Sequence, residues 1–135
     1  MNNPNKTCPF CIENKLLRVN VLYEDELWYI TDMEKGSINN AAMAMTKRHI
    51  ETPFELNDME WLELHNVIAK MKELVDVNEK PDGYNIGWNV YPAAGQNVPH
   101  AHLHLLARYD DEPLAGKGIR HAFKQADNLR GTNRE

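Results

Sequence analysis

Hydrophobic and polar residues alternate along several short stretches of the chain, and this two-residue period predicts β-strands. The first two stretches are separated by polar residues 24–26, which indicates a turn between them. The expected strands are residues 19–23, 27–31, 39–50, 84–90 and a stretch that begins near residue 100. Five short strands are therefore expected.

Between residues 57 and 78 the apolar residues recur at intervals of three and four, which predicts one long α-helix. Asn57 and Glu60 resemble a capping box at its start, and the sequence KPDG ends it. A polar tail follows at residues 110–135, with a short helix expected around residues 119–127. Strands gathered around one long helix predict an α+β fold with a mostly antiparallel five-stranded sheet.

The size and charge of the chain narrow the classes of protein to which it can belong. Its 135 residues suit a single domain spanning residues 1–135. The formal net charge of −5 argues against a nucleic-acid polymer as partner. No apolar run resembles a signal peptide or a membrane span, so we expect no membrane partner and a cytoplasmic location.

Three histidines, His100, His102 and His104, occupy alternate positions of the fifth expected strand. Successive side chains of a strand point to opposite faces, so the three imidazoles should share one face while the apolar residues between them enter the core. Neutral imidazole is both a nucleophile and a proton carrier. A row of three indicates a site that divides attack, charge stabilisation and proton delivery at one phosphorus atom.

The cysteines of CPFC, Cys8 and Cys11, have the spacing of half a zinc site and also that of a redox-active thiol pair. A redox pair would follow a hydrophobic strand, whereas these cysteines follow the polar leader MNNPNKT. Zinc needs two more ligands, for which His49 and His100 are the best candidates. A closed Cys2His2 site would be structural and would make residues 1–12 a zinc-binding arm. Unmetallated thiols and a redox pair remain the alternatives.

The sequence HAHLHLL resembles the signature of the histidine triad (HIT) family. The resemblance extends to GYNIGWNVYPAAGQNVPHAHLHLLAR and to KRHIETPFEL before the long helix. It implies a nucleotide-binding fold, usually dimeric, whose members hydrolyse or transfer nucleotidyl groups. Zinc-binding branches of the superfamily resemble this chain at all four candidate ligands, Cys8, Cys11, His49 and His100.

The resemblance also implies catalytic roles. His102 would attack the α-phosphorus of a nucleotide and form a nucleotidyl-histidine intermediate. His104 would contact the phosphoryl oxygens or assist proton transfer. Gln96 matches a glutamine that precedes the triad in many members, and it lies in a glycine-containing turn that could bind phosphate oxygens.

Further residues match substrate-binding positions of the family. Asp32 resembles a residue that binds ribose hydroxyls, and Asn89 one that reaches phosphate or ribose. Asn97 follows Gln96 where many members have Ser or Thr, so contacts to the leaving group should differ. Ala41 stands where many members have a histidine that orients the catalytic row, so another group must hold the nucleophile.

Together these features predict a homodimeric HIT-like hydrolase or nucleotidyl transferase that acts on a small-molecule nucleotide. A dinucleoside polyphosphate or a nucleoside phosphoramidate is the expected substrate class. One alternative is a nucleotide-binding module with little catalysis, which Ala41 favours. The other is a metal-dependent enzyme in which the three histidines of the row bind one catalytic ion.

Overall fold

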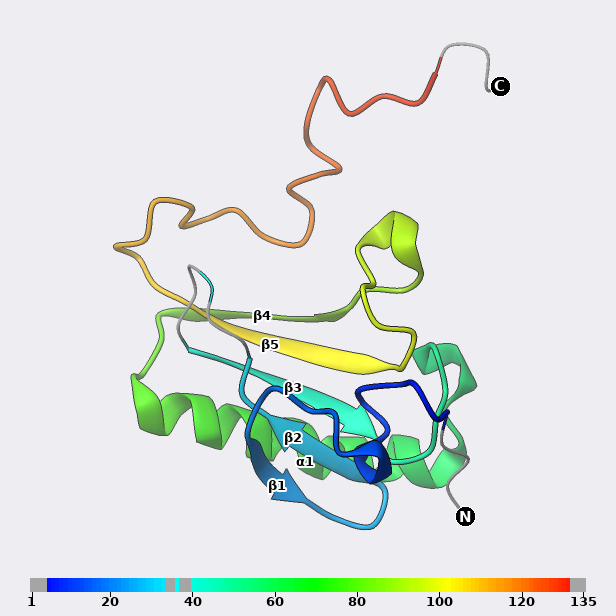
Figure 1. The fold of residues 1–135 in the computed structure, drawn as a ribbon. Coiled ribbons are helices and arrows are strands. Elements are labelled where there is room, and N and C mark those ends of the chain that lie inside the picture. The colour runs from blue at the N-terminus through cyan, green and yellow to red at the C-terminus, as the bar shows by residue number, and fades with distance from the viewer. Residues whose placement is uncertain (1–4, 34–35, 37–39, 132–135) are drawn as a thin grey trace.

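A computed structural model describes residues 5–33, 36 and 40–131 of the chain. Five strands form one antiparallel sheet in the order β1-β2-β3-β5-β4, and the helix α1 crosses one of its faces (Figure 1). The strands are β1 Val21–Glu24, β2 Trp28–Thr31, β3 Ala41–Thr46, β4 Gly83–Trp88 and β5 His102–Arg108, and the long helix is α1 Asp58–Asn78. Three short 3-10 helices also lie within the described residues, η1 Ile12–Asn14, η2 Pro53–Glu55 and η3 Pro92–Ala94. The expected α+β architecture is confirmed.

The helix α1 begins where the sequence predicts. The Asn57 side chain accepts a hydrogen bond from the backbone N–H of Glu60, and the Glu60 carboxylate accepts one from the N–H of Asn57. Its buried face packs against the sheet, in a core that includes Leu64, Val67, Met71, Val75, Trp28, Ile30, Ala44, Leu103 and Leu105. Within the described ranges, no helix combines the length and the apolar composition that crossing a bilayer requires.

Several expected boundaries differ from the observed ones. β3 ends at Thr46, well before residue 50, because the Thr46 hydroxyl donates to the backbone oxygen of Arg48 and turns the chain. The expected start of that strand, residue 39, lies outside the described residues. β5 begins only at His102, so His100 precedes the regular strand although alternation continues through it.

The helix expected around residues 119–127 is wrong: this segment is a series of turns. The helix would have to be stabilised by packing, yet Ile119 is 72% exposed and Phe123 is 84% exposed. A short helix without a buried apolar face is not stable in water.

The N-terminal arm, residues 5–20, covers the sheet face opposite α1. A second apolar cluster forms there around Tyr29, Met43 and Met45, with Phe10, Ile12, Leu17, Val19 and Met33 packed against it. Met43 and Met45 lie directly opposite His104 and His102 on β5. The arm and the histidine row therefore share one face of the sheet.

A buried ion pair joins the turn after β3 to the first turn of α1. The Arg48 guanidinium donates from Nε to Glu60 Oε2 at 3.1 Å and from Nη2 to Glu60 Oε1 at 2.8 Å. The Glu60 side chain is only 1% exposed, whereas that of Arg48 is 29% exposed. Glu60 thus serves both the helix cap and this pair.

We expect Arg48→Met to lower the free energy of unfolding by about 2 kcal/mol, because it leaves the Glu60 carboxylate buried without its counter-charge. The partial exposure of Arg48 keeps this value below that of a fully buried pair. Urea denaturation measures the change. The matched control is Lys72→Met, which breaks the exposed pair with Asp76 and should have a much smaller effect, because solvent screens such pairs. Equal losses in the two variants would contradict the role of Glu60.

Candidate functional site

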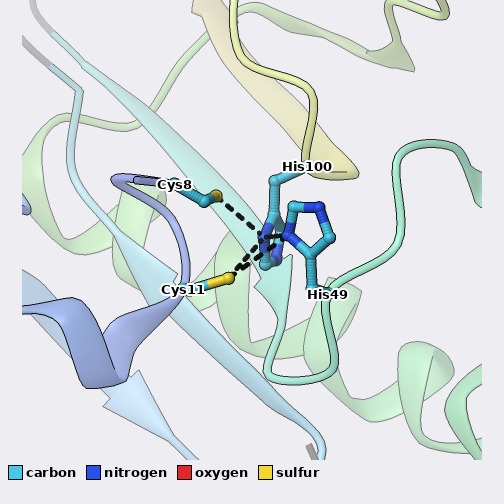
Figure 2. A group of neighbouring side chains, drawn as sticks. All are labelled: Cys8, Cys11, His49 and His100. Carbon is cyan, nitrogen blue, oxygen red and sulfur yellow. Dashed lines mark hydrogen bonds between the residues drawn. The ribbon is translucent and has the colours of Figure 1, made fainter. Parts of the chain in front are cut away.

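Four side chains from three parts of the chain converge at one end of the sheet (Figure 2). Cys8 and Cys11 come from the N-terminal arm, His49 from the loop after β3, and His100 from the segment before β5. One ligand atom of each residue lies within 4.8 Å of the ligand atoms of the other three. The structure thus brings together all four residues that the sequence predicts as metal ligands.

The tautomer of His100 follows from one hydrogen bond. Its Nε2 lies 2.7 Å from the backbone oxygen of Thr46, which can only accept a proton. The proton of this buried ring is therefore on Nε2, and Nδ1 presents its lone pair to the cluster. Outer hydrogen bonds of this kind orient histidine ligands in metal sites.

The distances within the cluster suit a tetrahedral metal. His100 Nδ1 lies 3.4 Å from Cys8 Sγ, 3.7 Å from Cys11 Sγ and 3.2 Å from His49 Nδ1. Cys11 Sγ lies 3.2 Å from His49 Nδ1. A zinc ion with nitrogen at about 2.0 Å and sulfur at about 2.3 Å separates such ligand atoms by about 3.3–3.5 Å.

The protonation of the thiols also bears on metal binding. Burial raises the pKa of the Cys11 thiol to about 11, so without a cation the group is neutral at pH 7. A bound metal supplies the charge that a buried thiolate needs. The four residues therefore fit a closed site of two sulfur and two nitrogen ligands.

Phe10 connects the cluster to the histidine row. It lies between the two cysteines in the sequence, and its ring meets the His102 ring edge-on at a centroid distance of 5.0 Å. Tyr29 fixes this position because its hydroxyl donates to the backbone oxygen of Phe10. The arm thereby covers the His102 ring.

His102 is buried and oriented by a main-chain group. Its Nδ1 lies 2.7 Å from the backbone oxygen of His100, so Nδ1 carries the proton and Nε2 carries the lone pair. Burial lowers the pKa of His102, which keeps the ring neutral at pH 7. A neutral imidazole with a defined lone pair is a nucleophile.

His104 lies beside His102, with ring centroids 4.8 Å apart. Burial, and to a smaller extent His102, lowers the pKa of His104 to about 4. Its Nε2 is buried and has no hydrogen-bond partner among the described residues. Such a group is costly unless a water molecule or a polar ligand satisfies it.

The three imidazoles of the row do not point to a common centre. His100 turns Nδ1 into the cysteine cluster, whereas His102 uses Nδ1 on the His100 carbonyl. The row is thus divided: His100 belongs to the four-residue cluster, whereas His102 and His104 form a separate pair.

The Gln96 amide is engaged with the main chain. Its Oε1 accepts from the N–H of Tyr91, and its Nε2 donates to the backbone oxygens of Glu51 and Val98. These bonds fix the loop between β4 and β5, in which Tyr91 and Gly95 both have positive φ. In this structure Gln96 shapes the loop next to the row.

The other expected substrate-binding residues lie apart from the pair. The Asp32 carboxylate accepts from the backbone N–H and the side-chain amide of Asn20, which caps the turn before β1. Asn89 and Asn97 are both exposed in the loop between β4 and β5. In the described ranges, no hydrogen bond joins these three residues to His102 or His104.

Two backbone groups that orient the histidine rings could not be predicted from the sequence. The carbonyls of Thr46 and His100 hold the two rings, and a carbonyl has no signature in the sequence. Asn40, next to Ala41, donates to the backbone oxygens of Val75 and Glu79 at the end of α1. Neither Asn40 nor Ala41 supplies an orienting histidine, and Ala41 lies opposite Leu106, four residues from His102. The contact that orients His102 comes from the His100 carbonyl.

Comparisons with known proteins identify the family of the chain. A HIT domain profile matches residues 15–111. An uncharacterised HIT-like protein of Methanocaldococcus jannaschii is 37% identical over 112 residues, which cover 78% of this chain and 81% of the relative.

Solved structures give the same result. A HIT family hydrolase from Clostridium thermocellum superposes with a TM-score of 0.67 at 28% identity, covering 82% of this chain and 97% of that one. A hypothetical histidine triad nucleotide-binding protein from Sulfolobus tokodaii gives a TM-score of 0.70 at 25% identity, covering 78% and 71%. From the matched profile, the sheet with its histidine pair and these relatives, we conclude that the chain belongs to the HIT family.

Proposed function

We propose that this protein is a nucleotide hydrolase or nucleotidyl transferase that acts through a nucleotidyl-histidine intermediate on His102. The observation that carries the proposal is the hydrogen bond from His102 Nδ1 to the His100 carbonyl. It leaves the Nε2 lone pair available next to the unpartnered Nε2 of His104. The names of the relatives, a hydrolase and a nucleotide-binding protein, support the same class of activity.

In the first step, His102 Nε2 attacks the α-phosphorus of the substrate. A phosphorus–nitrogen bond forms while the bond from phosphorus to the leaving group breaks, and the leaving group departs with the electron pair. The ring acquires positive charge, which the His100 carbonyl stabilises through Nδ1–H. The leaving group takes its proton from water.

In the second step, water or another acceptor attacks the same phosphorus. The phosphorus–nitrogen bond breaks, its electron pair returns to Nε2, and His102 is neutral again. The attacking oxygen loses its proton to solvent. In both steps the neutral His104 donates from Nε2 to a phosphoryl oxygen, which would satisfy this buried nitrogen.

Four further residues complete the proposed substrate site. Asp32 would bind the ribose after exchanging its bonds to Asn20, and Asn89 would reach phosphate or ribose. Gln96 would act at the phosphate mainly by holding the loop, and Asn97 would lie near the leaving group. A dinucleoside polyphosphate or a nucleoside phosphoramidate is the proposed substrate class.

The same hydrogen bonds bear on the two alternative functions, a catalytic metal bound by the row and a binding module with little catalysis. A catalytic metal shared by the row is disfavoured, because His100 and His102 direct their Nδ1 atoms to different partners. A binding module with little catalysis is favoured by Ala41, yet the His100 carbonyl supplies an orienting contact. Turnover of a bound nucleotide distinguishes the binding module from the enzyme.

We also propose that Cys8, Cys11, His49 and His100 hold a structural zinc ion. When bound, zinc would supply charge for the thiolates and no reactive position, since four protein ligands close the site. The tautomer of His100 and the distances in the cluster support this assignment. Neither cysteine forms a disulfide, which suits a reducing, cytoplasmic location.

A homodimer is the proposed assembly, with the 63–75 segment of α1 and the edge strand β4 in its interface. β4 is an edge strand of the sheet, with one side unpaired among the described strands. Ile86, on β4, is 39% exposed, and Leu62, on α1, is 71% exposed. These apolar side chains would be covered by a second copy.

We expect His102→Ala to lower turnover about 10³-fold or more, because it removes the attacking nitrogen. Nucleotide affinity should stay within about tenfold, since other groups make most binding contacts. Intact mass spectrometry should detect a nucleotidyl adduct in the wild type and none in this variant. His104→Ala is the matched control, which should be slower yet still form the adduct. Near wild-type turnover by His102→Ala would refute covalent catalysis at this residue.

Purified protein should contain about one zinc per chain, with two sulfur ligands near 2.3 Å and two nitrogen ligands near 2.0 Å by X-ray absorption. Cys8→Ser should lower the metal content, whereas Thr7→Ala, at an exposed neighbour outside the cluster, should not. Affinity should fall as pH falls, because the thiolates and imidazoles must be deprotonated to bind. Full metal content in Cys8→Ser, or a coordination shell altered by nucleotide, would contradict a structural zinc site.

Sedimentation at micromolar concentration should show a dimer. Ile86→Asp should shift it toward monomer, because a charge would be buried at the apolar interface. Glu26→Asp, in the turn before β2, is the control and should leave the dimer intact. A wild-type protein that sediments only as monomer would contradict the proposed assembly.

A further inference from the structure

The polar tail after β5 forms a cavity of about 380 Å³ against β4. It is lined by Asn85, Gly116, Lys117, Gly118, Ile119, Arg120, His121, Lys124 and Gln125. Asn85 is the contribution of the sheet, and the tail supplies the other eight residues. The cavity is separate from the cysteine cluster and from the loop that carries Gln96.

The lining of this cavity is cationic. Lys117, Arg120 and Lys124 carry positive charge, and none of the nine lining residues is acidic. The whole chain has a formal net charge of −5, so this concentration of positive charge is local. Such a lining attracts anions, and most strongly those with several charges.

Arg108 fixes the tail on the sheet. Its Nη1 donates to Asn85 Oδ1 and to the backbone oxygen of Lys117, and its Nη2 donates to the backbone oxygen of Leu114. The Glu112 carboxylate accepts from Nε and from Nη2 of the same guanidinium. The Arg108 side chain, at the end of β5, therefore holds together the two parts that line the cavity, Asn85 of β4 and the tail.

The cavity lies on the same sheet face as the histidine pair. Gly87 of β4 is directly opposite His104 of β5, and Asn85 is opposite Leu106, two positions further along. A Cβ placed on Gly87 would lie 3.5 Å from Ile119 Cδ1, so the tail reaches the position beside His104. The cluster, His102, His104 and the cavity thus follow one another along one face.

We propose that this cavity binds the phosphates of the substrate beyond the one that reacts at His102. The inference rests on the proposed function and refines it: polyphosphate substrates are preferred over phosphoramidates with an uncharged leaving group. The cavity lies beside His104, because Ile119 of its lining is next to Gly87, the residue opposite His104. Its positive charges match a polyphosphate rather than a neutral amine. Arg120 and Lys124 are the residues assigned to this contact.

The first test measures binding of inorganic tripolyphosphate to the full-length protein by calorimetry. The double variant R120Q/K124Q should bind at least about tenfold more weakly than the wild type, from the loss of two charged contacts. K15Q/K80Q removes two exposed lysines that lie outside the cavity and outside the proposed dimer interface. It is the charge-matched control, which should bind within about twofold of the wild type. Equal binding by R120Q/K124Q and the wild type, or no binding by the wild type, would overturn the proposal.

The second test compares two substrates under metal-replete conditions. The ratio of kcat/KM for a dinucleoside polyphosphate to that for a nucleoside phosphoramidate with a neutral leaving group should fall about tenfold in R120Q/K124Q. An unchanged ratio would mean that the tail acts only structurally, and would overturn the proposal. If the wild type turns over neither substrate, the proposed function fails, while tripolyphosphate binding still decides whether the cavity is an anion site.

Discussion

Two hydrogen bonds to main-chain carbonyls determine what each histidine of this protein can do. Thr46 accepts from His100 Nε2, and His100 accepts from His102 Nδ1. The first bond leaves the lone pair of His100 on Nδ1, which faces the cysteines. The second leaves the lone pair of His102 on Nε2, on the side of the ring away from the His100 carbonyl. Both acceptors belong to the backbone. The position of the Thr46 carbonyl depends on the pairing of β3 with β5, whereas the His100 carbonyl lies only two residues before the ring that it holds. The fold thus sets the tautomers before any ligand arrives.

The two faces of the sheet divide stability from chemistry. The face toward α1 carries the larger apolar cluster, and the ion pair between Arg48 and Glu60 joins the turn near His49 to that helix. The other face is covered by the arm, whose Phe10 ring contacts His102. Because this coverage excludes water, it lowers the pKa of the row and keeps the imidazoles neutral.

The strands, the long helix and the four-residue cluster could be predicted from the sequence, because strand alternation and metal-ligand chemistry both depend on the type and spacing of side chains. It placed His102 and His104 on one face for the same reason. It failed at residues 119–127, where propensity suggests a helix but no apolar partner buries Ile119 or Phe123. It could not foresee that the Gln96 amide bonds three backbone groups, since those contacts depend on how the loop folds.

The cluster also has a consequence for biosynthesis, since 92 positions separate Cys8 from His100. Both cysteines leave the ribosome before the last histidine of the cluster, which emerges roughly 5–20 s later at ordinary rates of translation. During that interval the two thiols stand three residues apart in an open chain, where oxidation would join them. An oxidising environment would therefore remove two members of the cluster before His100 is in place.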